Sequence, residues 1–259
     1  MNHSKYINVP LERLDIVSST NDYLSDLCKQ GKANEFYTVL AEEQTSGKGQ
    51  RGNVWESEPG KNLTFSIVLY PTTLEANKQF NLSMLVAISI VDALTDYTEG
   101  FSIKWPNDIY WKDRKICGIL IENELEGKYL SQSIVGIGLN INQDHFHSSA
   151  PNPISLYQIV GKEIDREEIF GKIIHAILSG YKALESNQHD LSEALHHLYR
   201  KYLYRKNGLQ LYRDKDGDFL AEIHNVGTDG CLYLKDEKDM IRKYAFKEIA
   251  YVIPEQRKS

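Results

Sequence analysis

Residues 44–55 read QTSGKGQRGNVW and bring three glycines, two cations and a tryptophan together in twelve residues. Glycines let a backbone bend tightly and bring its N–H groups close to an anion. Lys48 and Arg51 add positive charge, so the stretch suits a phosphate or a carboxylate. It is not a P-loop, because that motif requires Gly, four residues and then Gly-Lys-Ser/Thr. A solvated surface loop is the alternative interpretation, and this stretch alone leaves both open.

The stretch 104–108 reads KWPND and places polar side chains where a strand should end. Pro106 ends the strand, because its ring fixes φ and restricts the residue before it. The amide of Asn107 can recognise the edge of a base. Asp108 can hold a cation or orient Lys104. An ordinary turn is the competing interpretation, since Pro-Asn-Asp is good turn chemistry.

Two glycine-containing strands complete the set of candidate residues. Lys115 begins the first of them, RKICGIL, and its compact ammonium could bind an oxygen of an anionic substrate if it points inward. Gly118 lies in the same strand and leaves room close to the backbone. In residues 136–142, GIGLNIN, glycines alternate with apolar residues, which gives one small face and one apolar face. The small face favours an approaching ligand, and close sheet packing is the alternative.

The elements that must position these residues alternate between strands and helices. A helix should begin at the N-cap residues 18–22 and continue through Leu24 and Cys28 at helical spacing. We predict further helices over 74–97, 165–186 and 190–203. The period-2 and apolar runs predict strands over 11–17, 37–43, 62–70, 101–104, 109–111, 115–124 and 128–142. Strands, hairpins and later helices in this order predict an α+β domain with a mixed β-sheet.

The pattern changes near residue 207. From there, short strands alternate with Gly or Asp-Gly turns, which predicts a small β module of the size of an SH3-like barrel. We therefore divide the chain into a main domain over 1–203 and a small β domain over 207–259. The expected strands of the second are Leu209–Arg213, Phe219–Asn225, Cys231–Lys235 and Lys243–Phe246.

Composition narrows the class of protein. The 259 residues carry a formal net charge of −6, so the whole molecule has no electrostatic attraction to DNA or to an anionic membrane. The three cysteines lie far apart and form no Cys-x-x-Cys pair, which favours a reducing cytoplasm. The N-terminus lacks the apolar core of a signal peptide. The most apolar run, Leu82–Leu94, is too short to span a bilayer.

Taken in order, the motifs resemble those of the biotin–protein ligases. The resemblance covers most of residues 15–142, and KWPND is its most specific part. It implies a catalytic domain of the class II aminoacyl-tRNA synthetase and biotin ligase type, with a small C-terminal SH3-like domain. The matching pieces are Ser19-Thr-Asn21, the loop 44–55, 104–108, Arg114-Lys-x-x-Gly-Ile-Leu120 and Gly136-x-Gly-x-Asn140.

The resemblance implies a two-step reaction. Biotin's carboxylate attacks the α-phosphate of ATP to give biotinyl-5′-AMP and pyrophosphate, and a lysine of a biotin carboxyl carrier protein then displaces AMP. The resemblance assigns catalysis to Lys115, Arg51 and Lys48. Biotin binding is assigned to Ser19, Thr20, Asn21, Gln44, Gly47, Lys48, Gly49, Gln50, Lys115, Gly118 and Gly136. ATP binding is assigned to Arg51, Trp55, Lys104, Asn107, Asp108, Lys115 and Asn140.

The resemblance also gives roles to a metal and to the loop. Mg²⁺ is expected with ATP, held mostly by phosphate oxygens, with Asp108 as its protein contact. The glycine-rich loop is expected to close as a lid, with Trp55 covering the nucleotide and water kept from the mixed anhydride.

Two departures from the family's pattern matter. The family's usual Gly-Arg-Gly-Arg appears here as Gly-Lys-Gly-Gln followed by Arg51, so Gln50 loses a charge. The catalytic motifs begin at Ser19, which leaves no room before them for a helix-turn-helix domain, and we expect no DNA role. The competing hypotheses are a lipoate or octanoate ligase on the same fold and a non-catalytic biotin-binding protein. A homodimer through the hairpin near 115–142 stays open.

Overall fold

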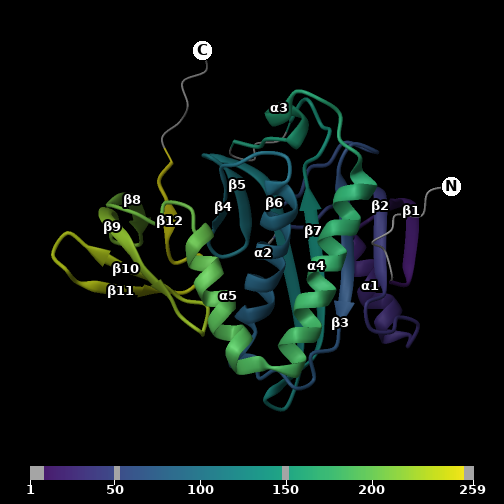
Figure 1. Ribbon diagram of the computed structural model, residues 1–259, viewed down its shortest axis with the longest axis horizontal. Helices are drawn as coiled ribbons and strands as arrows, with labels where there is room; N and C mark the ends of the chain where they lie inside the picture. The colour runs from purple at the N-terminus through teal and green to yellow at the C-terminus, as the bar shows by residue number, and fades with distance from the viewer. Residues whose placement is uncertain (1–8, 50–52, 148–151, 254–259) are drawn as a thin grey trace.

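One mixed sheet of seven strands organises the main domain, in the order β1-β2-β3-β7-β6-β5-β4 (Figure 1). A computed structural model describes residues 9–49, 53–147 and 152–253. β1 pairs parallel to β2, and the other neighbours are antiparallel. The strands are β1 (Leu11–Val17), β2 (Thr38–Gln44), β3 (Leu63–Leu69), β4 (Phe101–Lys104), β5 (Asp108–Trp111), β6 (Arg114–Glu126) and β7 (Tyr129–Leu139).

The register of this sheet separates a core face from a second face. Side chains alternate along a strand, so residues paired across strands share a face. One row of paired residues is Ile109, Cys117, Leu139 and Leu63, and all four are almost fully buried. The next row contains Asp108, Gly118, Gly138 and Thr64 and lies on the opposite face. The predicted division into a small face and an apolar face is therefore confirmed for residues 136–139, and β7 ends before 140–142.

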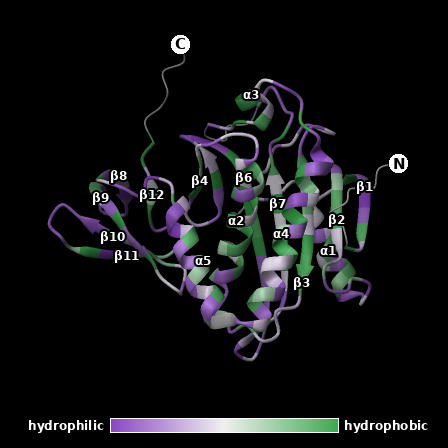
Figure 2. Ribbon diagram, viewed as in Figure 1, coloured by the Kyte–Doolittle hydropathy of each residue, from purple (hydrophilic) through white to green (hydrophobic). Residues whose placement is uncertain are grey.

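Helices cover both faces but unequally. α2 (Phe80–Thr95), α4 (Arg166–Ser186) and α5 (Gln188–Tyr202) pack together in front of the sheet in Figure 1. α1 (Thr20–Lys29) covers only one end of the second face, where Leu24 packs with Val39 and Ile134. Figure 2 shows the central strand β3 as largely hydrophobic, whereas the edge strand β1 mixes hydrophilic and hydrophobic residues. The uncovered part of the second face is open for a site.

A second sheet of five strands forms the C-terminal module, in the order β11-β10-β9-β8-β12. Its strands are β8 (Gln210–Asp214), β9 (Gly217–Val226), β10 (Leu232–Asp236), β11 (Ile241–Tyr244) and β12 (Ala250–Tyr251). The predicted α+β class and the small β module are confirmed. The predicted barrel is not closed, because β11 and β12 do not pair with each other within residues 152–253.

Two segments differ from the sequence-based prediction. The helix expected over 74–97 is shorter, because the backbone of 74–76 pairs with the tip of the β6–β7 hairpin at 128–130. A 3₁₀ turn, η2 (Ala76–Lys78), precedes α2. The unpredicted helix α3 (Leu156–Val160) begins with a capping box between Ser155 and Gln158. No helix in the described ranges is long and apolar enough to cross a membrane.

The N-cap of α4 provides a stability test. The side chain of Asp165 accepts a hydrogen bond from the backbone N–H of Glu167 at 2.9 Å. We expect Asp165→Ala to lower the free energy of unfolding by about 1 kcal/mol, because a first-turn donor loses its acceptor. Urea denaturation measures this. The control is Glu163→Ala, which removes only a long, exposed ion pair with Lys61 and should change the same quantity by less than about 0.5 kcal/mol.

Candidate active site

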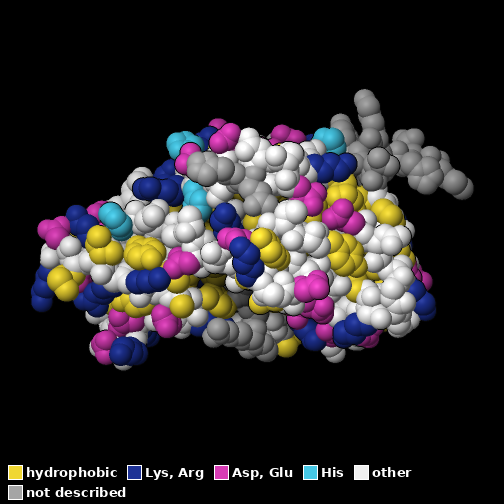
Figure 3. Space-filling view, turned by 90° about the horizontal axis from the view of Figure 1, so that it is seen from below, with side chains coloured by type: hydrophobic (Ala, Val, Ile, Leu, Met, Phe, Trp, Pro, Cys, Tyr) yellow, Lys and Arg dark blue, Asp and Glu magenta, His cyan; other side chains and the backbone are white. Residues whose placement is uncertain are grey.

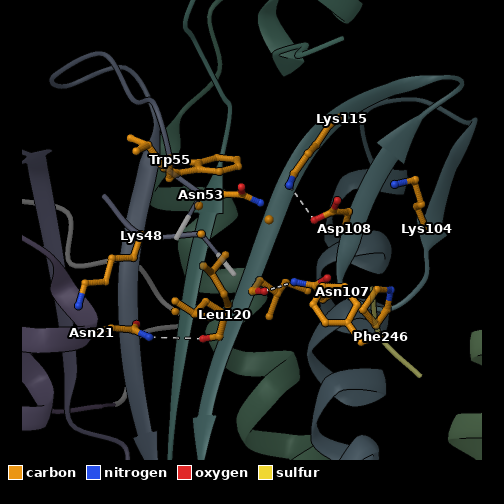
Figure 4. A pocket seen from close by; sticks show the side chains of 18 of the residues that line it. Asn21, Lys48, Asn53, Trp55, Lys104, Asn107, Asp108, Lys115, Leu120 and Phe246 are labelled. Carbon is orange, nitrogen blue, oxygen red and sulfur yellow. Dashed lines mark hydrogen bonds and ion pairs between the residues drawn. The ribbon is translucent and has the colours of Figure 1, made fainter. Parts of the chain in front are cut away.

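A cavity of about 310 Å³ lies on the second face of the sheet, between the glycine-rich loop and the C-terminal module (Figure 4). Figure 3 shows hydrophobic side chains in a hollow between the module, on the left, and the larger body. One carboxylate, Asp108, is among the described residues that line it. The lining lysines outnumber it: Lys48, Lys104, Lys115 and Lys247. In a chain of net charge −6, this local excess of positive charge favours an anionic ligand.

Three glycines form the floor of the cavity and allow side chains to lie flat on the sheet. A Cβ atom at Gly138 would lie 2.3 Å from the indole of Trp55, and one at Gly118 would lie 3.0 Å from the same ring. At Gly136, a Cβ would lie 2.2 Å from Oδ1 of Asn21. We predicted that these glycines leave space for a ligand. The structure shows that they first make room for Trp55 and Asn21, which then form the walls of the cavity.

Lys115 and Asp108 form an ion pair at the centre of this floor. The Nζ atom of Lys115 lies 2.7 Å from Oδ1 of Asp108 and 5.6 Å from the ring centroid of Trp55. The backbone of Lys115 is fixed on its other side, since its N–H donates to the carbonyl of Asn152 at 2.8 Å. Both charged side chains stay partly exposed, at 25% and 20%. Lys115 therefore points inward, and its ammonium can meet a ligand.

A buried polar cluster lines the end of the cavity next to α1. Oε1 of Gln44 accepts hydrogen bonds from the backbone N–H and the hydroxyl of Thr20, at 2.7 and 3.0 Å. The hydroxyl of Ser66 lies 2.7 Å from that of Thr20 and 2.6 Å from Oδ1 of Asn21. Ser19 caps α1 by accepting from the N–H of Asp22. These side chains offer donors and acceptors without a net charge, apart from Glu122, which accepts from Asn21.

The glycine-rich loop folds back on itself, so that its two ends meet. The N–H of Trp55 donates to the carbonyl of Gly47 at 2.9 Å, and Lys48 bridges to Val54. Gly47 shapes this hairpin and does not line the cavity, whereas Gly49 does. Gln50 and Arg51, both predicted site residues, lie outside the described residues.

Lys48 makes a contact that the sequence did not predict. Its ammonium lies 2.6 Å from Oδ1 of Asp22, at the start of α1, and in Figure 4 it points away from Lys115. The hydrogen bond to Asp22 raises the pKa of Lys48. The predicted catalytic contact of Lys48 therefore requires it to leave Asp22 and stays a prediction.

The KWPND stretch brings two polar side chains to the opposite end of the cavity. Burial lowers the pKa of Lys104, and Figure 4 shows its nitrogen directed toward Asp108. The side-chain amide of Asn107 donates to the carbonyl of Ile119, and the N–H of Ile119 donates back to the carbonyl of Asn107 at 3.1 Å. This pairing ties the turn after β4 to β6 and fixes the position of Asn107 on the cavity wall.

Asn140 is a predicted site residue that is buried in the structure. Its side chain is 2% exposed and donates to the carbonyl of Ile154 at 3.1 Å. It lies one position beyond β7, where the chain turns toward 152–156, and it is not among the residues that line the cavity. The predicted nucleotide contact of Asn140 stays a prediction, and its Oδ1 is buried without a hydrogen-bond partner in the described structure.

The structure adds cavity residues that sequence reasoning missed. Thr64 lies beside Gly138 in the register, and the alternation of the predicted strand 62–70 could have placed it there. The sequence carries no signal for the contribution of the C-terminal module, because those contacts depend on how the two sheets pack. They are Phe246, Lys247, Ile249, Ala250 and Tyr251.

The donor set around Asp108 fits a metal ion that arrives with its substrate. The described residues contain no cluster of three or more histidine, cysteine or acidic side chains suited to hold a metal. Asp108 is a single carboxylate beside a lysine-rich cavity. Mg²⁺ is often held by one or two carboxylates together with substrate phosphates, so this arrangement is compatible with it.

Residues 14–140 match the biotin/lipoate A/B protein ligase family. The chain therefore carries a catalytic domain of that family. Within the family, its likeness is to the members that use biotin. A biotin protein ligase from Aquifex aeolicus, solved with biotin and ATP, shares 26% identity and a TM-score of 0.76, covering 93% of this chain and 97% of that one.

Curated relatives support the same assignment. The chain is 29% identical over 236 residues to the bifunctional ligase/repressor BirA of Bacillus spizizenii, covering 89% of this chain and 71% of the relative. It is 34% identical over 137 residues to the biotin–[acetyl-CoA-carboxylase] ligase of Paracoccus denitrificans, covering 50% of this chain and 56% of the relative. The resemblance deduced from the motifs is confirmed.

Proposed function

We propose that the chain is a biotin–protein ligase, which activates biotin with ATP and transfers it to a lysine of a biotin carboxyl carrier protein. One observation carries this proposal. A single cavity joins a pocket at α1, lined mainly by neutral polar side chains, to an end at β4–β6 that carries Lys104 and Lys115, over a floor of glycines. The first end suits a neutral polar head group, and the second suits a carboxylate next to a triphosphate.

The polar cluster at α1 would bind the ureido head of biotin. Thr20, Asn21 and Gln44 now bond mainly to one another and to Ser66 and Glu122, so the ligand would exchange partners with them. A buried polar group left without a partner costs roughly 1–3 kcal/mol, and a cluster with several donors and acceptors avoids that cost. The apolar part of biotin would lie along the glycine floor.

Lys115 would carry the adenylation step. Its ammonium would orient the biotin carboxylate, whose oxygen attacks the α-phosphorus of ATP while the bond to pyrophosphate breaks. The same ammonium would then contact the adenylate phosphate. Fixed positive charge in a closed site neutralises two anions without the free-energy cost of reorganising water around them. Asp108 holds Lys115 in place at 2.7 Å and stays on the cavity wall.

The nucleotide would occupy the end between Trp55 and the C-terminal module. Trp55 would cover it, and Lys104 and Asn107 would lie beside its sugar and phosphates. Mg²⁺ would enter with ATP and neutralise phosphate charge, with Asp108 as its protein contact. In the second step, the amine of the carrier lysine attacks the mixed anhydride, and AMP leaves.

Transfer to a carrier domain tests the whole proposal. The chain, biotin, ATP and Mg²⁺ are mixed with an isolated biotin carboxyl carrier domain, and its mass is measured. We expect one biotinyl group on the acceptor lysine and none on a Lys→Arg acceptor. If the carrier stays unmodified although the chain binds biotin tightly, the result would favour the competing hypothesis of a non-catalytic biotin-binding protein.

The departure at Gln50 leads to a prediction about retention of the intermediate. We expect Arg51→Ala to release biotinyl-AMP roughly tenfold faster, because a charge-assisted hydrogen bond contributes about 1.5 kcal/mol or more. Gln50→Ala should have a smaller effect, since Gln50 has no charge to lose. Leakage is measured as free biotinyl-AMP in the absence of carrier. Equal leakage from both variants, or a reversed order, would contradict the prediction.

Three further parts of the proposal concern location, DNA and assembly; the first two rest on the sequence and the third on the sheet. Cysteine usage favours the cytoplasm, and the charge of −6 favours an enzyme without a DNA role. A homodimer is compatible with the sheet, because β5 pairs only with residues 114–118 of β6 and the same edge of residues 121–126 has no strand partner in the described chain.

A further inference from the structure

Lys104 is a partly buried cation held between two tyrosine rings. Its Nζ atom lies 5.2 Å from the ring centroid of Tyr110 and 5.1 Å from that of Tyr251. Within the described residues, Lys104 has no ion pair and donates no hydrogen bond, although it lines the cavity. Aromatic faces attract an ammonium without neutralising it. The ammonium therefore remains available to a ligand in the cavity.

The two rings come from different parts of the molecule. Tyr110 lies on β5, on the same face as Lys104, because Lys104 pairs with Asp108 and Ser102 pairs with Tyr110. Tyr251 comes from β12, in the C-terminal module. The module therefore supplies one of the two faces that hold a lysine of the main domain.

Tyr251 is itself fixed by the module. It pairs with Tyr212 of β8 in the sheet, and the two ring centroids lie 5.0 Å apart. Its ring also lies 5.9 Å from that of Tyr204. The hydroxyl of Tyr251 is buried without a hydrogen-bond partner in the described structure. The ring, and not the hydroxyl, is thus the part of Tyr251 that acts on Lys104.

We propose that Tyr251 is a positioning residue of the nucleotide subsite, and that its ring directs the ammonium of Lys104 toward the anionic oxygens of the triphosphate. This inference rests on the proposed function. The other charged groups near Lys104 are Asp108, Lys115 and Arg205, and none replaces the ring as its direct contact. Affinity for the nucleotide then depends on the C-terminal module through one aromatic contact.

The test separates the KM values for ATP and biotin in biotin-dependent ATP–pyrophosphate exchange. We expect Tyr251→Leu to raise the KM for ATP about tenfold and to change the KM for biotin by less than about twofold. Tyr251→Phe keeps the ring and should rescue the KM for ATP. The control is Tyr233→Leu, which removes a ring that Lys243 contacts at 5.6 Å in the same module, away from the cavity. It should leave both values unchanged.

Direct binding measurements distinguish a failure of the proposed role of Tyr251 from a failure of the proposed ligase function. ATP and biotin are each titrated into the same proteins by calorimetry, so the result does not depend on turnover. In a Lys104→Met background, Tyr251→Leu should cost less than about twofold in ATP affinity, because the contact has already been lost. Equal loss of ATP and biotin affinity, or no rescue by Tyr251→Phe, would overturn the inference. Wild-type protein that binds ATP but shows no exchange, with the Tyr251 effect intact, would refute only the proposed function.

Discussion

Replacing Lys115 by alanine is expected to slow biotin adenylation by about 100- to 1000-fold. This is the typical cost of removing one preorganised donor that stabilises developing charge, about 2.7–4 kcal/mol of barrier. Lys115 fits that role, because its ammonium is partly exposed to the cavity and its backbone is fixed by residues 152–154. Single-turnover formation of biotinyl-AMP, measured at saturating biotin and ATP, gives the rate of the chemical step.

The control for Lys115 lies on the same hairpin. Lys112→Ala removes a lysine from the β5–β6 turn whose ammonium lies over Trp111 and not in the cavity. It should leave the rate of adenylate formation within about twofold of wild type. A Lys115→Ala protein that is folded, binds both substrates and forms the adenylate at a near-normal rate would remove Lys115 from the mechanism.

Adding one methyl group at Gly136 is expected to weaken biotin binding by roughly tenfold to a hundredfold. The new Cβ would lie 2.2 Å from Oδ1 of Asn21, closer than two atoms can approach. Asn21 cannot move freely, because it bonds to Glu122 at 2.7 Å and contacts Ser66 at 2.6 Å. Overpacking of this kind costs typically 1–3 kcal/mol. Here it would displace Asn21 and so disturb the polar cluster that is proposed to bind biotin. Equilibrium titration with biotin measures the effect.

A double-mutant cycle shows whether the clash with Asn21 is the cause. Asn21→Ala removes the colliding atoms along with a proposed biotin contact. The double variant Gly136→Ala/Asn21→Ala should then bind biotin about as well as Asn21→Ala alone, because neighbouring changes that share one cause do not add. Additive losses would show that the methyl group blocks biotin itself, or distorts β7, and that the Asn21 contact is not the reason for the glycine.

Local patterns in the sequence predicted the sheet well. Strand β3 is observed at Leu63–Leu69 against a prediction of 62–70, since a long β-branched and apolar run between turn residues leaves few alternatives. The alternation of Gly136 and Gly138 with apolar residues also predicted the small face that became the cavity floor. The short helix α3 was missed, although Ser155 and Gln158 carry the capping-box spacing.

The site was less predictable, because side-chain partners are decided by tertiary packing. A motif can place Asn140 at the end of a strand but cannot show that its amide donates to the carbonyl of Ile154. The same holds for Lys48, which pairs with Asp22 from another element. Tyr251 lies about 150 residues beyond Lys104 in the chain, and only the packing of the two sheets brings them together.

The activation of biotin by ATP in this cavity is tested most directly by ATP–pyrophosphate exchange with wild-type protein, run in parallel with biotin and with lipoate. We expect exchange that requires biotin and is near background with lipoate, because the uncharged side chains of Thr20, Asn21 and Gln44 provide partners for a ureido head that lipoate lacks. Exchange that depends on lipoate would contradict this reading and select the rival ligase. Absence of exchange with both acids, while biotin still binds, would contradict the assignment of this cavity as an active site.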